Sequence, residues 1–136
     1  MIDANLNRLR EALRVSEDIA RYILDSAPLC RGLKAVRHRA TNIIESRPSL
    51  AKRFHPARSV STDVGRPSCS FEIKRRDCSD LFRANLERAK ESLRVLEEFF
   101  KLIDTRASEE FKTLRYKLYD IEKGSSRRLA SLRCIR

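Results

Sequence analysis

The hydrophobic positions of this chain follow a helical period in two stretches that lie 80 residues apart. In Ala4 to Ile23 and in Ala84 to Ile103, half of the twenty aligned positions carry the same residue. At about 100° per residue, the apolar side chains of each stretch gather on one face of a helix. Such a stripe is stable only when it is covered. The pattern therefore predicts two long amphipathic helices that pack against each other and against shorter helices.

Polar residues recur together with the leucines, which packing alone does not explain. The identical polar pairs at offset 80 are Asn5 and Asn85, Arg8 and Arg88, Glu11 and Glu91, Arg14 and Arg94, and Glu17 and Glu97. A shorter stretch continues the repeat at offset 78, where Arg37 corresponds to Arg115. Two copies are too few for a stacked array, which needs at least about three. We predict an all-α, internally duplicated helical bundle with two long-helix/short-helix repeats, related by a pseudo-twofold rotation.

Local signals predict where the helices begin and end. The expected helices span about residues 2–24, 28–45, 79–104 and 108–123. Pro28 suits a first helical turn, and Ser79 is a plausible N-cap for the long helix of the second repeat. Gly124 is expected to end the last helix.

A long irregular connector, residues 46–78, joins the two repeats. Prolines, a glycine and several serines interrupt it, although Leu50 to Phe54 could hold a helical turn and Phe71 to Ile73 a short strand. A connector of this length inside a compact domain is usually functional or disordered. The predicted organisation is a single duplicated helical domain at 1–123, with repeat one at 2–45 and repeat two at 79–123, followed by a basic C-terminal tail or linker at 124–136.

Composition supports long helices and locates the excess charge outside them. Charged residues make up 36% of the chain and hydrophobic residues 41%, with only three glycines and four prolines. The net charge is +11, and most of it lies in the segments Arg47 to Cys78 and Lys123 to Arg136. No apolar run is long enough for a signal peptide or a membrane span, so we expect a cytoplasmic protein. The four cysteines lie far apart without a CxxC pair, which favours reduced, small apolar residues over a zinc site.

The repeated charges admit two interpretations. The arginines and glutamates of the first helix follow one another every three residues, so they could pair along its surface for roughly 0.2–0.5 kcal/mol each. Alternatively, Asn5 and Glu17 lie at the edges of the apolar stripe, where arginines held by carboxylates would be preorganised to bind phosphate. Arg37 and Arg115 could add to the same phosphate site or be ordinary solvated arginines.

Several segments together resemble a known family. They are, in order, IDANLNRLREALRVSEDIAR, LKAVRHRA, ARSVSTDVG, ANLERAKESLRVLEEFFK and LRYKLYDIEK. They resemble the alternative hydroxymethylpyrimidine phosphate kinase family, the all-helical domain often fused ahead of thiamine phosphate synthase. The resemblance covers nearly the whole chain, and the ending SSRRLASLRCIR is similar to the linker that leads into the synthase barrel in fused members.

The resemblance implies a kinase that transfers the γ-phosphoryl group of ATP to 4-amino-5-hydroxymethyl-2-methylpyrimidine phosphate, giving the diphosphate for thiamine biosynthesis. ATP and Mg²⁺ would be its cofactors. The family pattern falls on Asn5, Arg8, Glu11, Arg14, Arg37, Arg58, Asp63, Gly65, Asn85, Arg88, Glu91, Arg94 and Arg115. Ser59 departs from the pattern, because an acidic or amide residue is expected after the arginine.

The residues themselves suggest roles within such a site. No GxxxxGK[ST] segment exists, so phosphate would be held by arginines and by backbone amides near Gly65, where a positive φ could form an anion-binding nest. Asp63 is the candidate for Mg²⁺ coordination or for accepting the hydroxymethyl proton. An aspartate before a Val-Gly turn is equally a common turn former.

Two other functions fit the sequence. The basic connector and tail could bind nucleic acid through phosphate contacts, but few aromatic residues are present for base stacking, so nucleic acid is the less favoured partner. The chain could also be a non-catalytic partner domain of thiamine phosphate synthase. The expected ligand is a small pyrimidine phosphate, no membrane contact is expected, and the sequence leaves a homodimer open.

Overall fold

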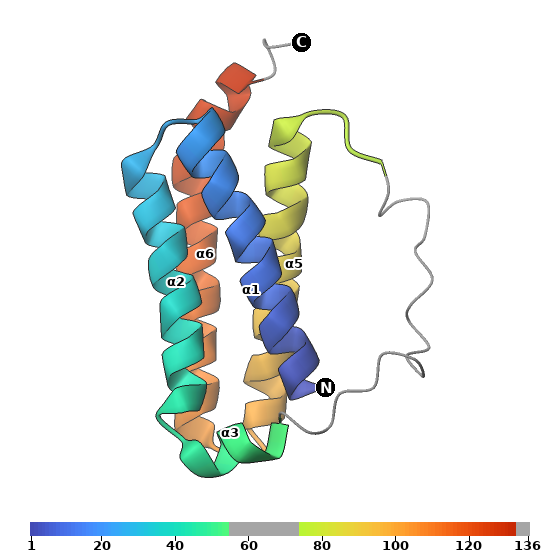
Figure 1. The fold of residues 1–136 in the computed structure, drawn as a ribbon, viewed down its shortest axis with the longest axis vertical. Coiled ribbons are helices and arrows are strands. Elements are labelled where there is room, and N and C mark those ends of the chain that lie inside the picture. The colour runs from blue at the N-terminus through green and yellow to red at the C-terminus, as the bar shows by residue number, and fades with distance from the viewer. Residues whose placement is uncertain (55–73, 133–136) are drawn as a thin grey trace.

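A computed structural model describes residues 1–54 and 74–132, and in these ranges the chain forms five α-helices, one π-helical turn and no strand (Figure 1). In chain order the elements are α1 (Ile2–Asp18), the π-helical turn η1 (Ile19–Ile23), α2 (Ala27–Glu45), α3 (Pro48–Phe54), α5 (Cys78–Phe100) and α6 (Thr105–Leu132). The all-α prediction is confirmed for the described residues. None of their helices is long and apolar enough to cross a membrane.

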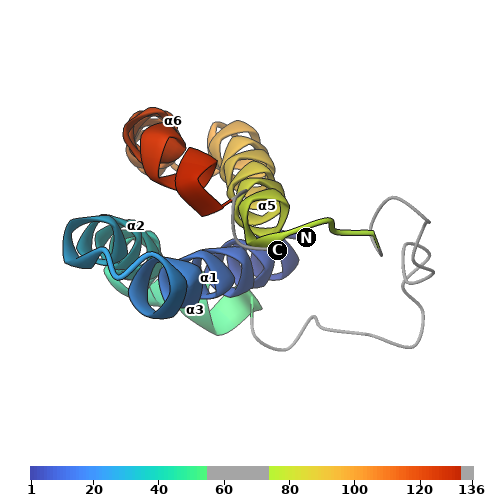
Figure 2. The ribbon, with the colours of Figure 1, turned by 90° about the horizontal axis from the view of Figure 1, so that it is seen from above.

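The four long helices form a bundle whose centre is the antiparallel pair α1 and α5 (Figure 1). Seen from above, α1 and α2 form one layer and α5 and α6 the other, and α2 also contacts α6 (Figure 2). Leucines of the repeated stretches, such as Leu13 and Leu93, are fully buried between the layers with Phe111. Each such side chain contributes about 1.5–3 kcal/mol by leaving water. The predicted packing of the two repeated helices against each other is confirmed.

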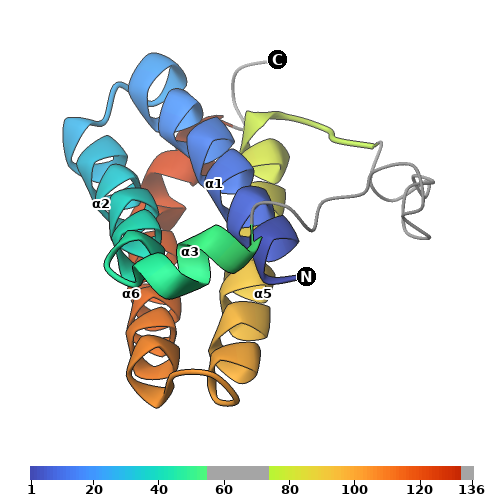
Figure 3. The ribbon, with the colours of Figure 1, turned by 60° about the horizontal axis from the view of Figure 1, so that its bottom comes forward.

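Several predicted helix ends are confirmed. α1 and η1 together reach Ile23, and α2 ends at Glu45 with Pro28 in its first turn. The helical turn expected at Leu50 to Phe54 is present as α3, which crosses below α1 and α2 (Figure 3). The strand expected at Phe71 to Ile73 lies outside the described residues.

The predicted beginning and end of the helix of repeat two are wrong. Asp77, not Ser79, is the N-cap of α5, because its carboxylate accepts a hydrogen bond from the backbone amide of Asp80 at 2.7 Å. The negative charge of this carboxylate also interacts favourably with the positive end of the helix dipole. Ser79 lies inside the first turn with a buried hydroxyl that has no hydrogen-bond partner in the described part of the chain. α5 ends at Phe100, four residues before the predicted end at Asp104.

The predicted boundaries of the last helix are also wrong. α6 begins at Thr105 and continues through Gly124 to Leu132. A glycine inside a helix costs about 1 kcal/mol relative to alanine. Here Leu129 and Leu132 are buried beyond it, so the apolar stripe continues past Gly124 and offsets that cost. The first part of the predicted tail is therefore helical, whereas the division into a domain and a linker stays a prediction.

An arginine clamp fixes the start of α6 to the end of α2. Asp104 accepts hydrogen bonds from the amides of Arg106 and Ala107 at 3.0 and 3.2 Å, which caps the helix. Arg47 donates to Asp104 at 2.5 Å and to Glu110 at 3.0 Å. The hydrogen bond from Arg47, with those from the two amides, holds the pKa of the Asp104 carboxyl below its ordinary value.

We predict that Asp104→Asn lowers the free energy of unfolding by about 1 kcal/mol at pH 7, since the ion pair with Arg47 is lost. A carboxylate with a lowered native pKa stabilises the fold above its unfolded pKa of about 4, and this stabilisation disappears as pH falls through the native pKa. The difference between wild type and variant should therefore shrink below about pH 4. Urea unfolding followed by circular dichroism at several pH values measures this, with the exposed Glu109→Gln as control. A difference independent of pH would contradict the assignment.

Candidate functional site

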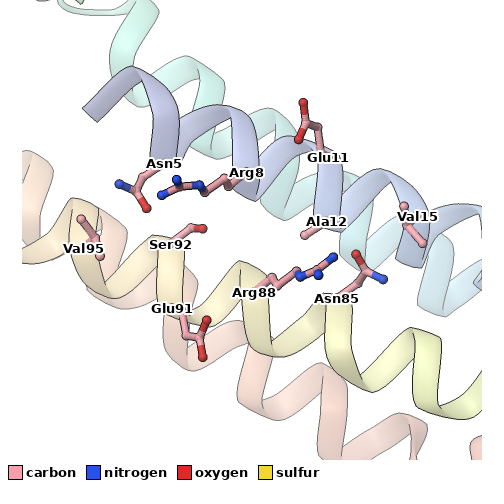
Figure 4. Close-up of a pocket in the computed structure, with 10 residues that line it drawn as sticks. All are labelled: Asn5, Arg8, Glu11, Ala12, Val15, Asn85, Arg88, Glu91, Ser92 and Val95. Carbon is pink, nitrogen blue, oxygen red and sulfur yellow. The ribbon is translucent and has the colours of Figure 1, made fainter. Parts of the chain in front are cut away.

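A cleft of about 670 Å³ lies along the seam between α1 and α5 (Figure 4). Its lining residues are Asn5, Arg8, Glu11, Ala12 and Val15 from α1, and Asn85, Arg88, Glu91, Ser92 and Val95 from α5. The two sets occupy the same five positions of the repeat at offset 80, and only Ala12 and Ser92 differ. The volume is typical of small-molecule sites.

The antiparallel packing of α1 and α5 arranges these residues reciprocally. Asn5 lies across the seam from Val95, whereas Asn85 lies across it from Val15 (Figure 4). The spacing of three and four residues keeps the lining positions of each helix on one face. The cleft therefore has two similar ends, each with an asparagine and an arginine from one helix.

The asparagines are fixed by the helices that carry them. Asn5 and Asn85 are both buried, and each donates from Nδ2 to the backbone carbonyl four residues earlier, that of Met1 at 3.1 Å and that of Leu81 at 2.8 Å. Each bond occupies one of the two N–H donors of Nδ2, and Oδ1 is left as an acceptor at the cleft.

The cleft arginines have no carboxylate partner among the described residues. Arg8 and Arg88 are exposed, each beside the asparagine of its own helix, and Glu11 points away from the opposite helix, as does Glu91 (Figure 4). The surface pairing predicted between each arginine and the glutamate three residues later is not formed here. Two unpaired guanidinium groups at one cleft favour an anionic ligand, and phosphate matches their bidentate geometry.

Two further repeated glutamates are buried and bind arginines of the neighbouring helices. Glu17 is 4% exposed and accepts from Arg37 Nε at 2.5 Å and Nη2 at 3.1 Å. Glu97 is 3% exposed and accepts from Arg115 Nε at 2.9 Å. The hydrogen bond to its glutamate raises the pKa of each arginine above its ordinary value. These pairs join α1 to α2 and α5 to α6.

The same two glutamates also form the predicted pairs along their own helix. Arg14 lies 3.5 Å from the Glu17 carboxylate, and Arg94 lies 3.0 Å from Glu97. Both arginine side chains are more than half exposed. The surface interpretation of the repeated charges is therefore correct at these positions, although each carboxylate itself is buried.

The structure thus brings together six of the predicted site residues and places four elsewhere. Arg14, Arg37, Arg94 and Arg115 do not line the cleft. Arg14 lines a smaller pocket of about 280 Å³, and Arg37 another of about 370 Å³. Arg58, Asp63 and Gly65 lie outside the described residues, so their roles stay predictions.

Sequence reasoning missed four lining residues, Ala12, Val15, Ser92 and Val95. Val15 and Val95 are identical at offset 80, and this identity is a signal that could have indicated them. Ala12 and Ser92 gave no such signal because they differ. In the described part of the chain, no group of three or more His, Cys, Asp or Glu residues could hold a metal ion.

Comparisons with known proteins agree on one family. A sequence model of the ThiD2 family matches residues 1–124. Similar curated proteins named thiamine-phosphate synthase come from Synechococcus sp. (strain CC9605), 39% identical over 123 residues, Parasynechococcus marenigrum, 38% over 123, and Synechocystis sp., 38% over 125. The alignments cover 90%, 90% and 91% of this chain. They cover 33%, 34% and 35% of the relatives, so the chain spans about a third of their length. No solved structure matches.

The buried glutamates lead to a stability prediction. Arg37→Met or Arg115→Met should lower the free energy of unfolding by about 3 kcal/mol or more, because each leaves a buried carboxylate without its cross-helix partner. Arg14→Ala and Arg94→Ala are matched controls that remove an exposed partner of the same glutamates, and should cost less than about 1 kcal/mol. Urea unfolding measures all four. Equal losses for the cross-helix arginines and for the exposed arginines would contradict the prediction.

Proposed function

Because the chain belongs to the ThiD2 family, we propose that it is a kinase that transfers the γ-phosphoryl group of ATP to 4-amino-5-hydroxymethyl-2-methylpyrimidine phosphate. The product would be the diphosphate for thiamine biosynthesis. The observation that carries the proposal is the pair of cleft arginines, Arg8 and Arg88, without a carboxylate partner in the described residues. The occurrence of this domain in proteins named thiamine-phosphate synthase agrees with the pathway.

The chemistry of the cleft suits an aminopyrimidine phosphate. Arginine binds phosphate through parallel N–H donors. The exocyclic amino group of the pyrimidine is a donor, and the Oδ1 atoms of Asn5 and Asn85 are acceptors at the same cleft. Binding energy from the substrate phosphate would position the hydroxymethyl group, so the unphosphorylated alcohol should react poorly.

The donor set also suits a Mg²⁺ ion that arrives with the nucleotide. Protein-bound Mg²⁺ is commonly held by one or two carboxylates together with substrate phosphates. Glu11 and Glu91 line the cleft and form no ion pair within the described ranges, but their carboxylates point away from the opposite helix, so each would turn inward to meet an ion carried by the nucleotide (Figure 4). When bound, the ion would neutralise charge on the phosphate oxygens. On sequence grounds we keep Asp63 as a proposed Mg²⁺ ligand or base, with Arg58 and Gly65 as proposed phosphate contacts.

The proposed work of the chain is positioning and electrostatic stabilisation. Phosphoryl transfer requires an in-line arrangement of donor and acceptor and cations around the transferring group, with little covalent chemistry from the protein. Arg8 and Arg88 would supply fixed positive charge at the two ends of the cleft. The buried asparagines beside them would hold the ligands in register with the arginines.

We further propose that the two halves arose by duplication and superpose by a near-twofold rotation. Equivalent positions line the cleft from both sides. Equivalent glutamates, Glu17 and Glu97, bind the equivalent arginines Arg37 and Arg115. Both observations support a common ancestor of the halves.

A second candidate function is a non-catalytic partner domain. The curated relatives carry the name thiamine-phosphate synthase, and this chain spans about a third of their length. Such a domain would bind a synthase and keep the cleft without turnover. Formation of a stable complex with a synthase, together with absence of diphosphate product, would favour this candidate over the kinase.

The activity is predicted to require the substrate phosphate. Purified protein incubated with ATP and Mg²⁺ should convert hydroxymethylpyrimidine phosphate to its diphosphate, and should leave the alcohol unchanged. Chromatography with mass detection identifies both products. Absence of the diphosphate under conditions where the protein is folded by circular dichroism would refute the proposed function.

The cleft glutamates lead to a prediction about the metal. In the Glu11→Gln and Glu91→Gln double variant, half-maximal activity should need several-fold more Mg²⁺, because carboxylates attract the ion and amides do so weakly. Glu109→Gln, an exposed glutamate on α6 outside the cleft, is the control and should not change the Mg²⁺ requirement. An unchanged Mg²⁺ dependence in the double variant would exclude these glutamates from holding the ion.

A further inference from the structure

The cleft consists of two nearly equivalent half-sites. We define the first half-site as Asn5 and Arg8 of α1 with Ser92 and Val95 of α5, and the second as Asn85 and Arg88 of α5 with Ala12 and Val15 of α1 (Figure 4). Each half-site has one buried amide and one exposed arginine. Each arginine lies beside the asparagine of its own helix (Figure 4).

We propose that the cleft binds two phosphate-bearing molecules at once, one in each half-site, with Arg8 contacting one phosphate and Arg88 the other. This inference rests on the proposed function, which needs a phosphate donor and a phosphorylated acceptor in the same cleft. A single site centred between the helices would instead draw both arginines onto one phosphate.

The position of the charges favours two ligands over one. Each guanidinium lies beside the asparagine of its own helix, so the donors and acceptors form two groups instead of one central cluster (Figure 4). A volume of about 670 Å³ also exceeds what one small phosphate ester fills. Two anionic groups in one cleft repel each other, and one arginine for each of them reduces that repulsion.

Ser92 is the lining residue that can distinguish the two ligands. Four of the five equivalent pairs are identical, and the fifth places a hydroxyl at the first half-site where the second has Ala12. Ser92 is 3% exposed, so a hydrogen bond from its hydroxyl to a ligand would be shielded from water. The ligand that uses this hydroxyl would prefer the first half-site.

The first experiment counts sites without assuming any reaction. Equilibrium dialysis with radiolabelled pyrophosphate should give two bound molecules per wild-type chain, one in Arg8→Gln, one in Arg88→Gln and none in the double variant. Arg21→Gln and Lys101→Gln are matched controls, because they remove exposed charges at equivalent positions outside the cleft, and both should keep two sites. One site in wild type that either cleft substitution abolishes would overturn the proposal.

The second experiment assigns the half-sites to substrates. Calorimetric titrations with hydroxymethylpyrimidine phosphate and with a non-hydrolysable ATP analogue should show that both bind together. Arg8→Gln should weaken one of them about tenfold or more and Arg88→Gln the other, as expected for a lost charged hydrogen bond. Competition between the two ligands, or equal weakening of both in each variant, would overturn the proposal. Two pyrophosphate sites without binding of either substrate would support the half-sites and refute the kinase.

The third experiment moves the hydroxyl of Ser92 from the first half-site to the equivalent position of the second. In the Ala12→Ser and Ser92→Ala double variant, the ligand that depended on Arg8 should depend on Arg88, because the hydroxyl now lies at the second half-site. Circular dichroism confirms that the variant folds, and Ala12→Ser alone separates a packing defect from the exchange. Unchanged dependence of each ligand on its original arginine would show that Ser92 does not distinguish the half-sites.

Discussion

The two buried carboxylates, Glu17 and Glu97, are the constraint on which the arrangement of the helices depends. An ionised group removed from water is stable only with a partner, and losing that partner costs about 3–5 kcal/mol. Each glutamate therefore fixes one arginine of the next helix, Arg37 on α2 or Arg115 on α6. This requirement holds α2 against α1, and α6 against α5, at a defined position. Because these ion pairs hold the other helices in place, one side of the seam between α1 and α5 can carry polar residues, and the cleft lies there.

The arginine–glutamate spacing of three residues occurs twice on α1, and the two occurrences lie on different faces of the helix and have different roles. Arg8 and Arg14 are six residues apart, which turns the second by about 120° from the first. Arg8 consequently lies at the cleft, whereas Arg14 pairs with a carboxylate that also binds α2. The repeat in the sequence contains both arginines, each with its counterpart on α5. It does not show which of them lies on the face between α1 and α5, because that depends on how the helices pack.

Periodicity predicted the helices well because burial of leucine decides where they form. It failed at their ends, where a capping residue or the extent of the apolar stripe decides. Asp77 outcompetes Ser79 as a cap since a carboxylate also interacts with the helix dipole, and Gly124 does not end α6 because Leu129 and Leu132 are buried beyond it. For the candidate site, the repeat pointed to Asn5, Arg8 and Glu11 with their counterparts, and these six residues line one cleft, whereas their role in binding stays a prediction. Local pattern could not separate them from the arginines that bind buried glutamates, because that distinction arises from contacts between helices.

A cleft built twice from the same residues carries a physical difficulty for a group transfer. Donor and acceptor are different molecules, and two identical half-sites would each accept either of them, so two donors or two acceptors could fill the cleft without reacting. Some asymmetry must therefore distinguish the ends. Among the described lining residues it is the hydroxyl of Ser92 in the first half-site, where the second half-site has Ala12. In the sequence it is the connector, which has no counterpart in the repeat. Duplication therefore accounts for the paired arginines, and the positions where the two halves differ would decide which end of the cleft binds the donor and which binds the acceptor.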